Sequence, residues 1–201
     1  MTRYHFLFLT LLLAIAVPFA AADTIQLSNN NLGIAGSIGT VTLTQQGAGQ
    51  VLVTVTANSG FSLKLNGGSV FFNTNATLNA LNFGTITADG NTVTFAHLRT
   101  GQNVDGRGIF SFQLLNFQGA PSQSASTISF MITAPGLTVK QLELANAKGN
   151  MWGVHFCVGS VCGATTGFAA GSLAVPEPGT LSLLGTGIVA LAGIFRRRFL
   201  S

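Results

Sequence analysis

Hydrophobic and polar residues alternate with a period of two through most of the chain between residues 23 and 174. In residues 40–44, 51–56 and 127–133, Val, Leu, Ile or Phe recurs at every second position. Successive side chains of a β-strand point to opposite faces of the sheet, so this alternation is typical of half-buried strands. No part of the region keeps the 3.6-residue period of an amphipathic helix. We therefore expect residues 23–174 to form one all-β domain.

Turn-forming residues divide this region into short strands. The dipeptide Asp89-Gly90 is typical of a type I′ hairpin turn, in which both central residues adopt positive φ. Such a turn fixes the register of the two strands that it joins, residues 84–88 and 91–98, with Ile86 opposite Val93 and Gly84 opposite Phe95.

Further strands are expected at residues 61–65, 69–72, 109–117, 127–133, 137–144 and 151–158. Eight to ten short strands, with turns at this spacing, predict an antiparallel β-sandwich or jelly roll. Its facing core layers are expected to come from two sets of alternating apolar residues: Phe110, Phe112 and Leu114 on one strand, and Ile128, Phe130 and Ile132 on another.

The first 22 residues have the three parts of a secretory signal peptide. Arg3 provides the positive charge, residues 6–17 are apolar, and the alanines at 20–22 form a small-residue cleavage site. The apolar run is too short for a comfortable membrane span. We therefore expect export and cleavage before Asp23.

The last 27 residues, 175–201, also have three parts. Pro176-Glu177-Pro178 is an extended element, because proline fixes φ and lacks an N–H group. Residues 179–195 carry no charge, and as a helix they would span roughly 25 Å, slightly less than the hydrocarbon core of a bilayer. The cluster Arg196, Arg197 and Arg198 follows. Clustered arginines stay on the cytoplasmic side, so these three residues would orient a single transmembrane helix with the β domain outside.

This arrangement resembles the PEP-CTERM sorting signal of exported bacterial proteins. The resemblance rests on Pro176, Glu177 and Pro178, the apolar segment 179–195 and the three arginines after it. It implies that an exosortase, a membrane-embedded cysteine transpeptidase, acts near the Pro-Glu-Pro element and passes the β domain to the cell surface or its polysaccharide matrix. The resemblance covers only the end of the chain and does not indicate what the β domain does.

The net charge of +4 belongs mostly to the two terminal segments. Between residues 23 and 175 there are five basic and four acidic residues, a balance of +1. A nucleic-acid-binding domain would need a concentrated basic surface, so we expect no nucleic-acid partner.

The chain contains two cysteines, Cys157 and Cys162. In an exported protein such a pair favours a disulfide over two free thiols. A two-residue turn at Gly159-Ser160 would place Val158 opposite Val161 and the two cysteines directly opposite each other, about 4.5 Å apart between Cα atoms.

Catalytic and metal-binding side chains are few. The alternation places Trp152, Val154 and Phe156 on the core face and His155 on the solvent face, while His97 ends a strand. Asp89 and Asp105 are expected in turns, Glu143 on a strand and Asp23 at the new N-terminus. These residues form no local Ser-His-Asp group, paired-carboxylate motif or metal-ligand spacing. We therefore expect no enzymatic activity and no cofactor.

Three functions remain open for the β domain. The first is a structural protein of the cell surface or extracellular matrix. The second is a carbohydrate-binding or adhesive module of the extracellular polysaccharide, which would present an exposed strip of aromatic residues. The third is an extracellular hydrolase, which would need acidic residues clustered at a cleft. The sequence favours the first.

Overall fold

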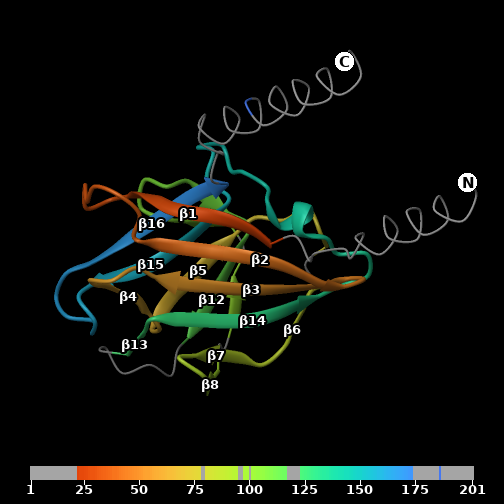
Figure 1. The fold of residues 1–201 in the computed structure, drawn as a ribbon, viewed down its shortest axis with the longest axis horizontal. Coiled ribbons are helices and arrows are strands. Elements are labelled where there is room, and N and C mark those ends of the chain that lie inside the picture. Colours follow the sequence, from red (N-terminus) through yellow and green to blue (C-terminus); the bar gives the residue numbers. More distant parts are fainter. Residues whose placement is uncertain are drawn as a thin grey trace, which may run out of the picture.

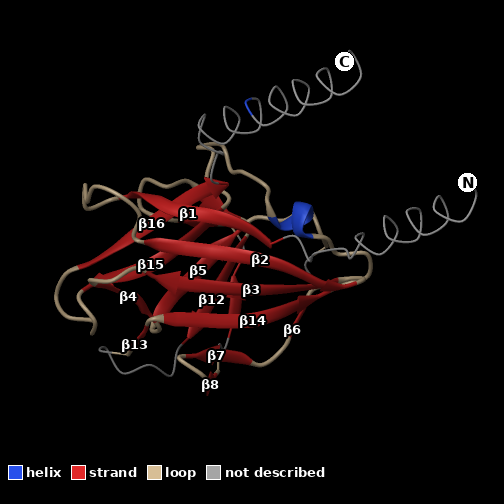
Figure 2. Ribbon diagram, viewed as in Figure 1, coloured by secondary structure: helices blue, strands red, loops and turns tan. Residues whose placement is uncertain are grey.

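The computed structural model describes residues 22–77, 80–94, 97–99, 101–116, 123–173 and 186. All the strands pair antiparallel, and strands make up nearly all of the regular structure drawn in colour in Figure 2. The predicted all-β antiparallel class is therefore confirmed. The expected signal peptide lies outside the described residues except for Ala22. The expected transmembrane helix 179–195 also lies outside them except for Thr186.

The bounds of the elements are as follows. The first strands are β1 (Ala22–Asn30), β2 (Gly39–Gly47), β3 (Gln50–Ala57), β4 (Phe61–Lys64) and β5 (Gly67–Phe72). Five short strands come next: β6 (Asn82–Phe83), β7 (Ile86–Ala88), β8 (Asn91–Val93), β9 (His97–Arg99) and β10 (Gln102–Asn103). The remaining elements are β11 (Ile109–Phe110), β12 (Phe112–Asn116), β13 (Ser124–Ala125), β14 (Thr127–Thr133), the 3-10 helix η2 (Val139–Leu142), β15 (Trp152–Val158) and β16 (Thr166–Leu173).

Among the described residues, fourteen strands form one curled sheet, so the main core is enclosed by a single sheet and not by the two facing sheets of a sandwich (Figure 1). Its main path runs β8-β7-β14-β3-β2-β1-β16-β15-β5-β12-β9, and β10 and β11 form a separate two-stranded sheet. The outermost strands of the path, β8 and β9, are joined by residues 94–96 alone. The half that contains β14, β3 and β2 faces the half that contains β15, β5 and β12, and the main core lies between them.

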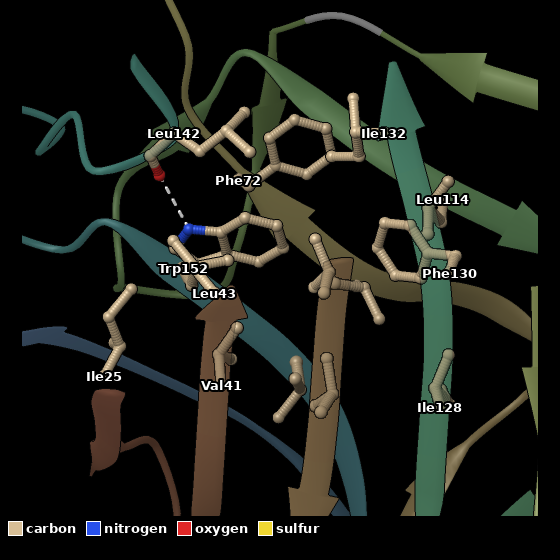
Figure 3. Close-up of a cluster of buried hydrophobic side chains, with 14 of the residues drawn as sticks. Ile25, Val41, Leu43, Phe72, Leu114, Ile128, Phe130, Ile132, Leu142 and Trp152 are labelled. Carbon is tan, nitrogen blue, oxygen red and sulfur yellow. Dashed lines mark hydrogen bonds between the residues drawn. The ribbon is translucent and has the colours of Figure 1, made fainter. Parts of the chain in front are cut away.

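Stacked aromatic rings form the centre of this core (Figure 3). The ring of Phe72 stacks on that of Trp152, with 4.7 Å between the centroids. It also stacks on Phe112, with 4.9 Å between the centroids. The indole N–H of Trp152 donates a 2.7 Å hydrogen bond to the backbone carbonyl of Leu142. From the opposite half, β14 contributes its alternate residues Ile128, Phe130 and Ile132, all buried as predicted.

The predicted strand 109–117 is broken at Ser111, so Phe110 does not share a face with Phe112 and Leu114. The Ser111 N–H donates to the Asn73 side chain at 2.9 Å instead of continuing a ladder. Phe112 and Leu114 enter the main core, whereas Phe110 packs in a second cluster with Phe71, Val104 and Ala170. The expected common face was therefore wrong for Phe110.

The prediction of a strand at residues 137–144 is also wrong, because this segment contains the 3-10 helix η2. The side chain of Gln45 accepts a hydrogen bond from the Val139 N–H at 3.1 Å and donates to the Leu137 carbonyl at 3.2 Å. The Gln141 side chain accepts from the Thr138 N–H at 2.9 Å. These side chains satisfy backbone groups that a strand would have paired in a ladder.

The Asp89-Gly90 turn has the predicted geometry. Both residues have positive φ, 48° and 81°, and Ile86 pairs with Val93. The strand that precedes the turn is shorter than expected, because Gly84 donates its N–H to the Met131 carbonyl of β14. Its expected partner Phe95 lies outside the described residues.

Candidate functional site

The two ends of the β domain meet on neighbouring strands. Strand β1 begins at Ala22 and strand β16 ends at Leu173, and Ile25 of the first pairs with Leu173 of the second. Because the two strands are antiparallel, the start of β1 and the end of β16 lie at the same end of the sheet (Figure 1). In the chain, the end of β16 directly precedes the predicted sorting residues.

Strand β16 is an interior strand of the sheet, so it belongs to the folded domain up to its last residue. It pairs with β1 on one side and β15 on the other, with Gly171 opposite Trp152. A Cβ atom on Gly171 would lie 1.7 Å from the carbonyl oxygen of Gln26, so only glycine fits at this approach of two backbones.

The predicted sorting residues Pro176, Glu177 and Pro178 lie outside the described residues. The same is true of the predicted orienting residues Arg196, Arg197 and Arg198. Within the described ranges, no helix has the length and hydrophobicity needed to cross a membrane.

Three charged side chains meet beside the start of β1. The Lys140 ammonium of η2 lies 3.3 Å from the Asp23 carboxylate and 2.7 Å from the Glu143 carboxylate. Lys140 is largely exposed, and its hydrogen bonds to Glu143 and Asp23 raise its pKa. Glu143 is buried; desolvation is the main cause of its raised pKa, and its Oε1 atom is buried without a hydrogen-bond partner.

The sequence did not indicate this cluster. In the structure Glu143 follows η2 rather than lying on a strand, and the cluster brings it together with Asp23, which is 120 positions away in the chain. No local motif marks such a pair, because the contact depends on the packing of η2 against the beginning of the sheet.

The other two acids of the domain have structural roles in turns, as expected. The Asp89 carboxylate accepts hydrogen bonds from the backbone N–H groups of Ser126 and Thr127 at 3.0 and 2.8 Å. The Asp105 carboxylate accepts one from the Asn31 side chain at 2.5 Å. Among the described residues, no group of three or more His, Cys, Asp or Glu side chains is placed to hold a metal ion.

His155 is half-buried rather than solvent-facing, which corrects the expectation. Its ring stacks on Phe168 of the adjacent strand at 4.3 Å between centroids, whereas Trp152, Val154 and Phe156 face the core as predicted. Burial lowers the pKa of His155 to about 4, and the nearby charge of Lys64 acts in the same direction. His97 lies on β9, and its side chain is not described.

We expect His155 to make the domain less stable in mild acid. Its pKa is about 4 in the folded state, against an ordinary value near 6.5, so between these values the unfolded chain binds more protons. The free energy of unfolding should therefore fall as the pH drops from about 6.5 to about 4. Urea titrations at pH 7 and pH 4.5 should show a smaller difference for His155→Gln than for the unaltered protein, and equal differences would contradict this role.

Cys157 and Cys162 form a disulfide, as predicted, with their Cα atoms 5.1 Å apart. The expected two-residue turn is wrong, however. The Val158 N–H donates a hydrogen bond to the Thr165 carbonyl, so Val158 does not face Val161. The strand partner of Cys157 is Thr166. The disulfide therefore fastens a wider loop back onto the end of β15, and the Gly159 N–H donates to the Gly60 carbonyl of the neighbouring turn at 2.7 Å.

Removing the disulfide should have a modest effect, because the bridged cysteines are only five positions apart. A short closed loop removes little entropy from the unfolded chain, so we expect Cys157→Ala/Cys162→Ala to lose about 2 kcal/mol of stability. Intact mass after alkylation without reductant should show no labelled thiol in the exported protein. Two labelled thiols would show that the bridge does not form.

The described surface has no aromatic strip. Trp152 is fully buried, and the exposed large hydrophobic residues are aliphatic: Leu32, Ile109, Val158 and Val161. A pocket of about 400 Å³ lies beside η2, lined by Gln45, Gly47, Ala48, Gly49, Gly136, Leu137 and Thr138. Its lining has neither a charged nor an aromatic side chain, so it offers no side chain for acid–base chemistry and no ring on which a sugar could stack.

Comparison with known proteins identifies the segment that follows β16. Residues 174–198 match the family model of the PEP-CTERM protein-sorting motif, directly after the last residue of β16. No curated protein and no solved structure matches the chain.

Proposed function

Since the chain carries a PEP-CTERM protein-sorting motif, which marks an exported protein sorted by exosortase, we propose that it is a structural component of the cell surface or extracellular matrix. In this proposal the first 22 residues direct export. The segment 179–195 then holds the precursor in the membrane, oriented by Arg196, Arg197 and Arg198, until exosortase acts near Pro176-Glu177-Pro178.

The observation that carries the proposal is the position of the motif relative to the fold. The matched segment begins at residue 174, and the sheet is complete at Leu173. Cleavage near residues 176–178 would therefore leave all the described strands in the released domain. A motif that overlapped β16 would instead require an interior strand to be cut or unpaired.

A structural role for the domain is supported by the kind of surface that it presents. The described acids Asp89 and Asp105 are engaged in turns, and Asp23 and Glu143 both form ion pairs with Lys140. The alternative of a carbohydrate-binding module has no exposed aromatic strip among the described residues to support it. We therefore propose that the domain is not an enzyme and that it contacts the matrix without aromatic stacking.

Replacing Pro176, Glu177 and Pro178 together by alanine tests the proposed sorting. The variant should insert into the membrane normally, because the apolar segment and the arginines are unchanged, but release of the domain should be lost. Pulse-labelling followed by fractionation measures both steps.

Pro135→Ala is a matched control, because Pro135 is an exposed turn residue of the domain itself. It should be released at the normal rate. Release of the triple-alanine variant at the same rate as this control would contradict the proposal.

A further inference from the structure

The carboxylate of Glu143 has an incomplete set of partners. Its side chain is only 4% exposed, and Oε2 accepts the bond from Lys140, but Oε1 has no hydrogen-bond donor. A buried carboxylate oxygen without a donor costs free energy, so such an atom indicates a missing partner. The missing partner should be a hydrogen-bond donor, and preferably a cation.

The surrounding charges point in the same direction. Asp23 and Glu143 contribute two negative charges and Lys140 contributes one positive charge, which leaves the cluster with a net charge of −1. The neighbouring strands β2 and β16 contain no charged residue in residues 39–47 and 166–173. One further positive charge would neutralise the cluster.

Export processing would create that charge within the cluster itself. Hydrolysis of the Ala22–Asp23 peptide bond by a signal peptidase consumes one water, leaves a carboxylate on Ala22 and gives Asp23 an α-ammonium group with three N–H donors. The Asp23 side chain lies 3.3 Å from Lys140, and the new ammonium would be on the α-carbon of the same residue, so it would belong to the cluster that Lys140 and Glu143 complete.

We propose that the α-ammonium of processed Asp23 binds the Glu143 carboxylate and thereby fastens the start of β1 to η2. The inference rests on the proposed function, because it requires export and cleavage before Asp23. It makes the processed domain more stable than its precursor. The start of β1, which lies beside the end of β16, would thus be held more stably once the N-terminal segment has been removed.

The pH dependence of this contact has a definite sign. A neighbouring carboxylate raises the pKa of an α-ammonium above its ordinary value of about 8. Stabilisation by the group is therefore complete below about pH 8 and is lost as the pH rises through the higher pKa of the folded state. The facing charged groups are Asp23 and Glu143, which favour the charged amine, and Lys140, which opposes it.

The test moves the ammonium while leaving the cluster intact. Inserting Gly-Ser between Ala22 and Asp23 keeps the alanine cleavage site but displaces the new amine by two residues. In the otherwise unaltered exported protein, this insertion should lower Tm by about 2–4 °C. In the Glu143→Gln background it should change Tm by less than about 1 °C, because the partner carboxylate is absent.

Equal shifts in the two backgrounds, or no shift in either, would overturn the proposal. A second measurement needs no substitution: acylation of the Asp23 amine in the exported protein should be about tenfold slower at pH 8 than in an unstructured peptide with the same first residues. Equal rates would overturn the proposal. N-terminal sequencing that finds a first residue other than Asp23 would also overturn it, while leaving sorting through Pro176, Glu177 and Pro178 to its own test.

Discussion

Trp152→Ala is expected to lower the free energy of unfolding by about 3–5 kcal/mol, among the largest effects of any single change in the core. The indole is fully buried and stacks on Phe72, so its removal leaves a cavity between the two halves of the curled sheet. It also leaves the Leu142 carbonyl, at the end of η2, without the N–H donor that it has at 2.7 Å. Urea denaturation followed by circular dichroism measures the loss.

Two further variants separate the contributions to this loss. Trp152→Phe keeps an aromatic ring beside Phe72 but removes the N–H donor, so it should cost about 1–3 kcal/mol. Ile109→Ala is the surface control, because Ile109 is 62% exposed, and it should change stability by less than about 0.5 kcal/mol. A Trp152→Ala variant as stable as the Ile109→Ala control would show that the ring stack is not at the centre of the core.

Gly171→Ala is expected to cost about 3 kcal/mol, although it adds a single methyl group. The new Cβ atom would lie 1.7 Å from the Gln26 carbonyl oxygen, and that atom is backbone and cannot rotate away. Relief requires β1 and β16 to separate where they carry the two ends of the domain. The variant should therefore also expose the start of β1 to proteases.

Gly163→Ala is the matched control for this prediction. Gly163 directly follows the bridged Cys162, and a Cβ atom there would meet nothing within 4 Å. It should be close to neutral in thermal denaturation. Equal melting temperatures for the two alanine variants would contradict the close approach of β1 and β16.

Features set by neighbouring residues could be predicted from the sequence. Asp89-Gly90 supplies the two positive φ angles of its turn, and this alone fixed the register of Ile86 against Val93. The strict alternation of residues 127–133 likewise identified β14 and its buried face. In both cases the local pattern and the tertiary structure agree, so no distant contact was needed.

Features set by distant contacts could not be predicted in this way. Strand β16 has the sequence Thr-Gly-Phe-Ala-Ala-Gly-Ser-Leu, whose small residues are required by close neighbours rather than by β-propensity. The interruption at Ser111 depends on the Asn73 side chain, 38 positions away. Both were missed because the partner that decides the local structure is remote in the chain.

The candidate site divides in the same way. The sorting motif is a linear arrangement of two prolines, an apolar run and arginines, and it can be recognised without any knowledge of the fold. The cluster of Asp23, Lys140 and Glu143 exists only because η2 packs near the start of β1. A pattern of alternating residues identifies buried positions, and it says less about the surface through which the proposed structural domain would make its contacts.

Tryptic peptide mapping of the exported protein tests the central claim most directly. The last basic residue of the domain is Lys148 and the next is Arg196, so one peptide that begins at Gly149 reports where the chain ends. A complete domain followed by a processed motif predicts that this peptide ends after Leu173 and before residue 179. A peptide that runs intact from Gly149 to Arg196, or one that ends before Leu173, would contradict it.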